Sequence, residues 1–203
     1  NEIVDIAIDT FGRWVRGVDL AGDEVTYPPE RFIEPFQRAY DAGLHITIHA
    51  GEAMGAESVR KAVLYLHPQR IGHGVRSVEN SSVVRMLYEQ GITLEVCPTS
   101  NLHTGVVPTL AVHPLADLLR LRLQVTLNTD DPGVSATTLT DEVLVAVERI
   151  GVAPGAIYRM LRHSVDAAFI PDEERAGLCA RLAQALAYDP DGRAAFSATA
   201  AAS

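Results

Sequence analysis

The 203-residue sequence predicts an α/β fold of the (β/α)-barrel type. Short runs rich in Val, Ile, Thr and Leu alternate with stretches in which apolar residues recur every three or four positions. Buried strands joined by amphipathic helices show this pattern. Every strand candidate ends in polar or glycine residues, and the chain has no Gly-rich phosphate loop of the doubly wound type. Polar residues at the ends of all strands favour a barrel, whose active site gathers at those carboxyl ends.

Five strands are predicted, at residues 14–20, 45–49, 70–72, 92–97 and 124–128. Apolar stripes at helical spacing lie between them, as in Phe32, Phe36 and Tyr40. The fifth strand is followed by a helical tail, residues 140–187, with helices expected at 140–150, 154–169 and 171–187. Residues 189–203 are small and Ala-rich, and we expect a weakly ordered end there. Five strands are too few to close a barrel of eight, so the sequence predicts part of one.

The composition excludes several classes of partner. The chain carries 17 Lys and Arg against 26 Asp and Glu, a formal net charge of −9, which argues against binding a nucleic-acid backbone. No apolar run approaches the ~18 residues that a membrane-spanning helix needs, and the first residues lack the basic segment of a signal peptide. The two cysteines, Cys97 and Cys179, make no disulfide framework. We therefore expect a cytoplasmic protein with no nucleic-acid and no membrane partner.

Polar residues at the predicted strand ends suit metal or acid–base chemistry. His49 ends an apolar strand, where an imidazole serves either as a metal ligand or as a hydrogen-bonded core side chain. Glu52 follows on a turn and is either a general acid in a partly dry pocket or a solvated carboxylate. His73 stands between two glycines, within reach of a bound water. Asp130 and Asp131 are adjacent carboxylates, which need a neutralising cation if they are buried and otherwise form an exposed turn.

At these positions the sequence closely resembles the adenosine deaminase family, zinc-dependent hydrolases that fold as a (β/α)8 barrel. The matching stretches occur in the family's order: residues 19–24 (Asp-Leu-Ala-Gly-Asp-Glu), 49–52 (His-Ala-Gly-Glu), 72–74 (Gly-His-Gly), 97–101 (Cys-Pro-Thr-Ser-Asn) and 128–132 (Asn-Thr-Asp-Asp-Pro). The first strand here looks like the family's fourth. The resemblance implies that residues 1–203 are the carboxyl-terminal part of one barrel domain, with about strands 4–8 of its eight.

By this resemblance the protein binds one Zn²⁺ ion, with His49 and Asp130 as two of its ligands. His73 would orient and deprotonate, or electrostatically steady, the reactive water. The family's first strand carries a His-x-His pair that completes the zinc site, and no His-x-His occurs in these 203 residues. Two further His ligands are therefore expected upstream, on the other half of the same polypeptide, and this chain alone is expected to be inactive. The remaining histidines are interpreted as structural: His45, His67, His103, His113 and His163.

The resemblance also implies a substrate and a reaction. Glu52 would donate a proton to N1 of a purine, Asp131 would hydrogen-bond N7, and the backbone of Gly22 would approach N3. The reaction is the hydrolytic deamination of adenosine, and of deoxyadenosine, with release of ammonia; adenosine gives inosine. Two alternatives stay open: the same chemistry on a modified adenosine or on adenine, and a non-catalytic paralogue that binds nucleosides or a partner protein. A cytidine-deaminase type of zinc site is excluded, because the chain has no Cys-x-x-Cys pair.

Overall fold

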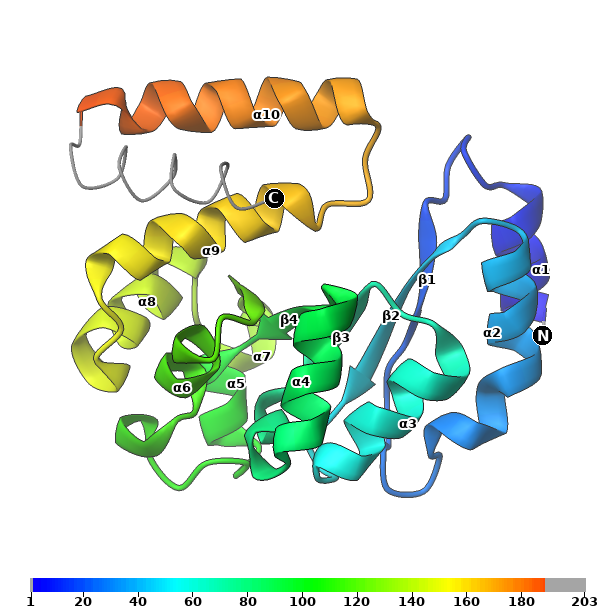
Figure 1. Cartoon of the computed structure of the whole chain (residues 1–203), viewed down its shortest axis with the longest axis horizontal. Coiled ribbons are helices and arrows are strands. Elements are labelled where there is room, and N and C mark those ends of the chain that lie inside the picture. The colour runs from blue at the N-terminus through cyan, green and yellow to red at the C-terminus, as the bar shows by residue number, and fades with distance from the viewer. Residues whose placement is uncertain (1, 189–203) are drawn as a thin grey trace.

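The computed structural model describes residues 2–188, which contain one five-stranded parallel sheet (Figure 1). Its strands are β1 (Gly17–Leu20), β2 (His45–Ala50), β3 (Arg70–His73), β4 (Thr93–Val96) and β5 (Gln124–Leu127). They lie side by side in the order of the sequence, and each neighbouring pair is parallel. A doubly wound sheet would reverse its strand order at a switch point, so the sequential order confirms the barrel-type α/β fold.

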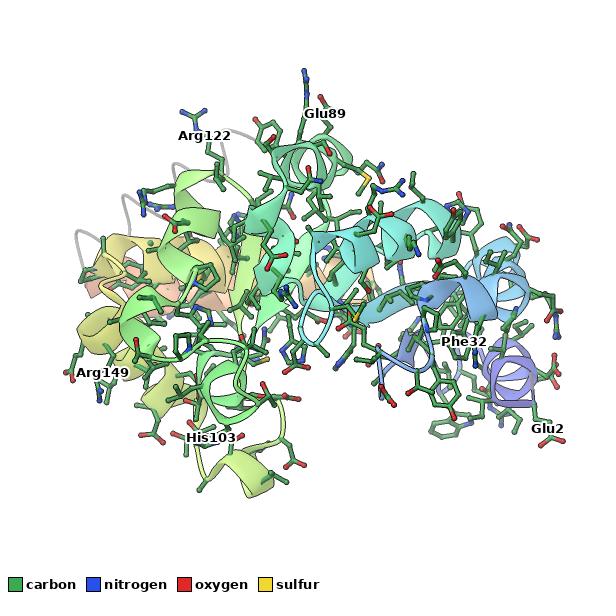
Figure 2. All side chains as sticks on the ribbon, turned by 90° about the horizontal axis from the view of Figure 1, so that it is seen from below. Glu2, Phe32, Glu89, His103, Arg122 and Arg149 are labelled. Atoms are coloured by element: carbon green, nitrogen blue, oxygen red, sulfur yellow. The ribbon has the colours of Figure 1, made fainter. Side chains whose placement is uncertain are left out.

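Helices precede the first strand, connect the strands and follow the last one. In chain order they are α1 (Glu2–Asp9), α2 (Ile33–Asp41), α3 (Ala56–Leu66), α4 (Ser81–Gln90), α5 (Pro98–His103), α6 (Leu115–Arg120), α7 (Pro132–Ser135), α8 (Leu139–Leu144), α9 (Pro154–Asp166) and α10 (Asp172–Ala185). α2 and α3 pack on β2, whereas α6 and α9 pack on β5. In Figure 2, Glu89 of α4 and Arg122 after α6 extend from one side of the molecule, and His103 of α5 extends from the opposite side. None of these helices is both long and apolar enough to cross a membrane.

The sheet is apolar on the face that the helices cover and polar on the other face. Ile46 and Ile48 of β2 are fully buried in the hydrophobic core. The alternate residues point the other way, because side chains along a strand alternate between its two faces. On that second face the Arg70 guanidinium donates to the Thr47 hydroxyl at 3.0 Å and pairs with Glu95 at 3.2 Å. This polar face looks into the barrel interior.

β1 is shorter than the strand predicted at residues 14–20. It begins at Gly17, and Trp14 is 79% exposed, so the prediction is wrong for the first three of those residues. The chain before Gly17 forms a turn instead, in which the amide of Trp14 donates to the carbonyl of Thr10. Strand pairing then requires a glycine, because a Cβ at Gly17 would lie 2.5 Å from the carbonyl oxygen of His45. The other four strands begin and end within one residue of their predicted limits.

The helices predicted after β5 are present, with differences at their ends. The helix expected at residues 140–150 is α8 followed by a wider π-helical turn at Val145–Ile150. The helices expected at 154–169 and 171–187 are α9 and α10, and both end earlier than predicted. α10 packs on α9, away from the sheet (Figure 1). No element was predicted where α1 lies, and the end predicted as weakly ordered, residues 189–203, lies outside the described residues.

Glu142 of α8 joins the loops that follow β4 and β5. Its side chain is fully buried and accepts hydrogen bonds from the amide of Thr99 at 3.2 Å and from the hydroxyl of Thr137 at 2.8 Å. Glu142→Ala leaves both donors without a partner, so we expect the free energy of unfolding to fall by about 3 kcal/mol in urea denaturation of the intact protein. Glu148→Ala, at an exposed position, is the control and should change it by less than about 0.5 kcal/mol. Equal midpoints for the two variants would contradict this role of Glu142.

Candidate active site

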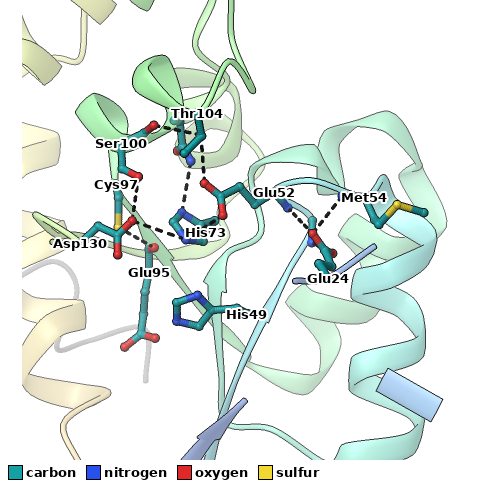
Figure 3. A network of polar contacts seen from close by, with 12 residues as sticks. Glu24, His49, Glu52, Met54, His73, Glu95, Cys97, Ser100, Thr104 and Asp130 are labelled. Atoms are coloured by element: carbon teal, nitrogen blue, oxygen red, sulfur yellow. Dashed lines mark hydrogen bonds and ion pairs between the residues drawn. The ribbon is translucent and has the colours of Figure 1, made fainter. Parts of the chain in front are cut away.

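The strand ends on the polar face of the sheet surround a cavity of about 330 Å³. Its wall includes His49 of β2, His73 at the end of β3, Asp130 just after β5, and Glu95 of β4. Figure 3 shows His73 between Glu52 and Asp130, with the ring of His49 nearby. Three of the predicted site residues, from three separate parts of the chain, thus line one cavity, and a fourth, Glu52, contacts His73.

His49 lies beside a carboxylate of the neighbouring strand. Its Nε2 atom is 3.3 Å from Oδ2 of Asp19 on β1, and its ring centroid is 5.2 Å from that of His73. The position paired with it on β3 is Gly72, where a Cβ would lie 2.6 Å from the His49 ring. The hydrogen bond with Asp19 raises the pKa of His49, and burial opposes it by lowering that pKa. The surroundings of this imidazole therefore favour positive charge, whether a proton or a metal ion carries it.

His73 is enclosed and strained. Its side chain is 2% exposed, and its Nε2 atom lies 3.4 Å from Oε2 of Glu52 and 3.9 Å from Oδ2 of Asp130. Burial lowers the pKa of His73, and the two carboxylates oppose that shift. His73 and Asp130 both have a φ of +59°, a left-handed conformation that non-glycine residues rarely adopt. Such strain is typical of functional sites, where the surrounding structure holds the residue in place.

Glu52 stands on the turn after β2, and a second carboxylate holds that turn. Glu24 Oε1 accepts from the amide of Gly51 at 2.6 Å, and Glu24 Oε2 accepts from the amide of Met54 at 2.9 Å (Figure 3). The hydroxyl of Thr104 donates to Glu52 Oε1 at 3.1 Å. The side chain of Glu52 is 24% exposed. Its carboxyl group is thus held beside His73 of the cavity wall and is partly exposed.

The adjacent carboxylates of Asp130 and Asp131 serve different contacts. Asp130 Oδ2 accepts from the hydroxyl of Ser100 at 2.7 Å, beside the cavity. Asp131 Oδ1 accepts from the amides of Gly133 and Val134 at 3.0 and 3.1 Å, and so caps the short helix α7. Asp131 is exposed and does not line the cavity. The structure therefore brings Asp130, but not the side chain of Asp131, together with the other predicted residues.

Gly22 lies in the loop after β1, where its backbone is open to a ligand. It lines a second cavity, of about 170 Å³, that also touches His49. Its φ is +129°, which L side chains rarely adopt, and no atom lies within 4 Å of where a Cβ would stand. The two cavities share His49, so a ligand that spans them would meet the backbone of Gly22 and the carboxylates at the strand ends.

The sequence of the chain matches a known family over most of its length. Residues 1–185 match the family model described as adenosine deaminase. The chain belongs to the adenosine deaminase family. The resemblance read from the five motifs is thereby confirmed, and so is the barrel-type fold that it implied.

Relatives within the adenosine deaminase family differ in their named substrate. The adenosine deaminase of Erwinia tasmaniensis is 44% identical over 169 residues, which are 83% of this chain and 51% of that protein. The adenine deaminase of Chelativorans sp. is 44% identical over 168 residues, 83% of this chain and 52% of that protein. The crystal structure of an amidohydrolase from Burkholderia ambifaria, with bound Zn, has a TM-score of 0.82 at 27% identity, and the match covers 98% of this chain and 54% of that one. The chain spans about half the length of the curated relatives it matches.

The side chains at the cavity have the atom types that zinc binds, but His49 and Asp130 alone are fewer than the ligands of a catalytic zinc site. A catalytic zinc takes nitrogen, oxygen or sulfur ligands from three side chains and leaves a position open. His49 and Asp130 offer one nitrogen and one oxygen donor at the same cavity, although His49 Nε2 itself contacts Asp19. Ligand atoms of His73, Cys97 and Asp130 lie within 4.8 Å of one another, but burial raises the pKa of the Cys97 thiol well above its usual value and disfavours the thiolate. His49 and Asp130 stay the predicted ligands.

Sequence reasoning missed the side chains that hold the predicted residues in place. They are Asp19, Glu24, Ser100, Asn101, Thr104 and His113. Asp19, Glu24, Ser100 and Asn101 lie inside the motifs shared with the adenosine deaminase family, so the motifs contained a usable signal for them. His113 lies outside every motif, and a lone histidine gives no indication of a partner so distant in the sequence.

Proposed function

We propose that the complete protein hydrolytically deaminates adenosine and deoxyadenosine, and that this chain carries the carboxyl-terminal half of its active site. The observation that carries the proposal is that His49, His73 and Asp130 line one cavity, with the carboxylate of Glu52 3.4 Å from Nε2 of His73. Membership in the adenosine deaminase family supports the chemistry. The proposal assigns His49 and Asp130 to a zinc ion, and Glu52 and His73 to the reacting atoms.

The chemistry follows from these assignments. Zinc, when bound, lowers the pKa of a water to about 7 and so supplies a nucleophile at neutral pH. Glu52 holds a proton toward ring N1 and transfers it as the nucleophilic oxygen bonds to C6, which becomes tetrahedral. His73, fixed between Glu52 and Asp130, orients that oxygen. The amino group then takes up a proton and leaves as ammonia, so that adenosine and one water give inosine and ammonia.

Two further contacts place the purine in the proposal. The backbone of Gly22 faces open space beside His49, and we assign it to purine N3. Asp131 is assigned to N7, with a proton on its carboxyl group, because N7 is itself an acceptor. Asp131 Oδ1 already accepts two backbone amides, which leaves Oδ2 for this contact.

The proposal includes an upstream half of the same polypeptide. His49 and Asp130 offer fewer donors than the three side chains that hold a typical catalytic zinc, and β1 and β5 are the edges of the sheet within residues 2–188. A further segment with a His-x-His pair would supply two more ligands and the missing strands, and this chain alone would be inactive. A cytoplasmic location is part of the proposal, and it is supported by the free state of both Cys97 and Cys179.

Adenine and a modified adenosine are the alternative substrates. Equal identity to an adenosine deaminase and to an adenine deaminase gives neither one an advantage. The segment from Cys97 to Asn101, followed by Thr104 and Gly105, looks more like the adenosine branch, and Thr104 donates to Glu52. We therefore keep adenosine as the proposed substrate.

The test is metal analysis and formation of the 6-oxopurine product with the complete, purified protein, because N6-methyladenosine would release methylamine and not ammonia. Adenosine, deoxyadenosine, adenine and N6-methyladenosine are supplied in turn. We expect one zinc ion per polypeptide and the highest kcat/KM with adenosine. If adenine or the methylated nucleoside is turned over faster, that compound replaces adenosine as the proposed substrate, and the proposed hydrolytic reaction stands. A folded protein with no metal and no turnover would leave only the non-catalytic binding paralogue.

A further inference from the structure

Two buried side chains form a hydrogen-bonded relay behind His73. His73 Nδ1 lies 3.2 Å from the amide nitrogen of Asn101, and Asn101 Oδ1 lies 3.2 Å from Nε2 of His113. The backbone amide of Leu115 donates to His113 Nδ1 at 3.1 Å. Asn101 and His113 are 0% and 4% exposed, so water does not compete for these contacts. Neither residue has a part in the proposed function so far.

The direction of every hydrogen bond in this relay follows from its backbone end. An amide N–H always donates, so Leu115 makes His113 Nδ1 an acceptor and leaves the ring proton of His113 on Nε2. That N–H needs an acceptor, which is the side-chain oxygen of Asn101. The NH2 group of Asn101 is thereby turned to His73 Nδ1, which must accept. Burial lowers the pKa of His113 to about 4, in keeping with the neutral ring that the relay requires.

The contacts on the other side of His73 agree with this assignment. With Nδ1 an acceptor, the proton of the neutral ring lies on Nε2. Nε2 faces two acceptors, Oε2 of Glu52 at 3.4 Å and Oδ2 of Asp130 at 3.9 Å (Figure 3). Both sides of the ring therefore favour the same tautomer.

We propose that Asn101 and His113 are positioning residues that hold His73 in its Nε2–H tautomer, as a hydrogen-bond donor to the attacking oxygen. The relay offers no acceptor for a proton on Nδ1, and so it disfavours the other tautomer. An Nε2 atom that already carries a proton cannot remove one from water. His73 therefore orients and steadies the nucleophile and does not deprotonate it. The tautomer stands on the contacts alone, and its effect on turnover rests on the proposed function.

The tautomer is measured directly by long-range proton–nitrogen NMR on the complete protein labelled with nitrogen-15 histidine. The signals are assigned from the spectra of His73→Gln and His113→Gln. We expect wild-type His73 and His113 each to carry a proton on Nε2 and none on Nδ1. Asn101→Asp keeps the shape of the side chain but replaces its NH2 group by an oxygen, so that carboxylate oxygens face the rings of both His73 and His113. We expect His73 Nδ1 to gain a proton in this variant.

Kinetics on the same variants separate positioning from a merely structural role. Asn101→Asp should lower kcat about 10- to 100-fold and leave KM within about threefold, as is typical when the partner of a site residue is changed. His113→Gln keeps an N–H donor toward Asn101, so it should retain the wild-type tautomer of His73 and most of kcat. His113→Leu removes that donor and frees the Asn101 amide to rotate. It should give a mixture of tautomers and a lower kcat.

His163 provides a matched control. Its Nδ1 lies 3.1 Å from both the amide nitrogen and the carbonyl oxygen of Val125, and it makes no contact with the relay. His163→Gln should leave the tautomer of His73 and kcat unchanged. If Asn101→Asp does not fold, the wild-type spectrum and the two His113 variants still decide the assignment.

The outcomes separate the relay from the proposed function. A wild-type His73 with its proton on Nδ1, or an Asn101→Asp protein whose Nδ1 stays unprotonated, would overturn the relay. A protein that shows the expected tautomer but no deaminase activity would keep the relay and refute the proposed function. An unchanged kcat in Asn101→Asp, with the proton moved to Nδ1, would overturn the role of His73 as a donor in turnover.

Discussion

Glu52→Gln in the complete protein is expected to lower kcat about 10³-fold and to leave the zinc content at the wild-type level. A glutamine has the shape of the glutamate but no proton to give to purine N1. It can also keep the local contacts, because its oxygen can face His73 while its NH2 group faces the hydroxyl of Thr104, which accepts as well as donates. The loss would therefore reflect the missing acid and not a rearranged turn. The measurements are kcat from ammonia release and metal analysis of the same sample.

Glu57→Gln is the matched control for this prediction. Glu57 is an exposed carboxylate on the neighbouring helix α3 and pairs with Arg60. The substitution changes the net charge by the same amount as Glu52→Gln, and kcat should stay near the wild-type value. Near-normal turnover in Glu52→Gln would remove Glu52 as the acid, whereas loss of zinc from that variant would make it a residue that supports the metal site.

The cluster at the strand ends was predictable because strand ends in a parallel sheet meet at one edge. His49 and His73 follow directly on short apolar runs, and each reaches the cavity for that reason. Their protonation and contacts were not predictable. Asp19 comes from the neighbouring strand β1, and only the register of β1 and β2 places its carboxylate 3.3 Å from Nε2 of His49.

The adjacent residues Asp130 and Asp131 show what a sequence motif does not predict, namely the direction in which each side chain points. Both residues are aspartates, but the backbone at Asp130 has a left-handed φ. The carboxylate of Asp130 lies beside the cavity, and that of Asp131 accepts from the amides of α7. Backbone strain of this kind comes from the packing around the residue, and local propensity opposes it. Trp14 is the converse case. Its apolar, aromatic character predicts a strand, but the turn before Gly17 satisfies the backbone and leaves the indole exposed.

Gly72→Ala is expected to weaken zinc binding by the complete protein about 10- to 100-fold, because it displaces the ring of His49. An added Cβ would stand 2.6 Å from Cδ2 and 2.9 Å from Nε2 of His49, closer than packed atoms allow. The ring cannot move away without losing the contact of 3.3 Å between Nε2 and Asp19. Gly72 does not have a positive φ, so the effect comes from this clash and not from the backbone conformation.

Competition with a chelator measures the dissociation of zinc from Gly72→Ala, and kcat is measured with zinc in excess. The control is Gly155→Ala in α9, where no atom lies within 4 Å of the added Cβ and where alanine favours the helix. The control should bind zinc as the wild type does. Unchanged zinc affinity in Gly72→Ala, with a spectrum showing that the His49 ring has moved, would mean that this imidazole is not a ligand. Asp130 would then have to find its nitrogen partners elsewhere, and the zinc assignment for this chain would rest on that carboxylate alone.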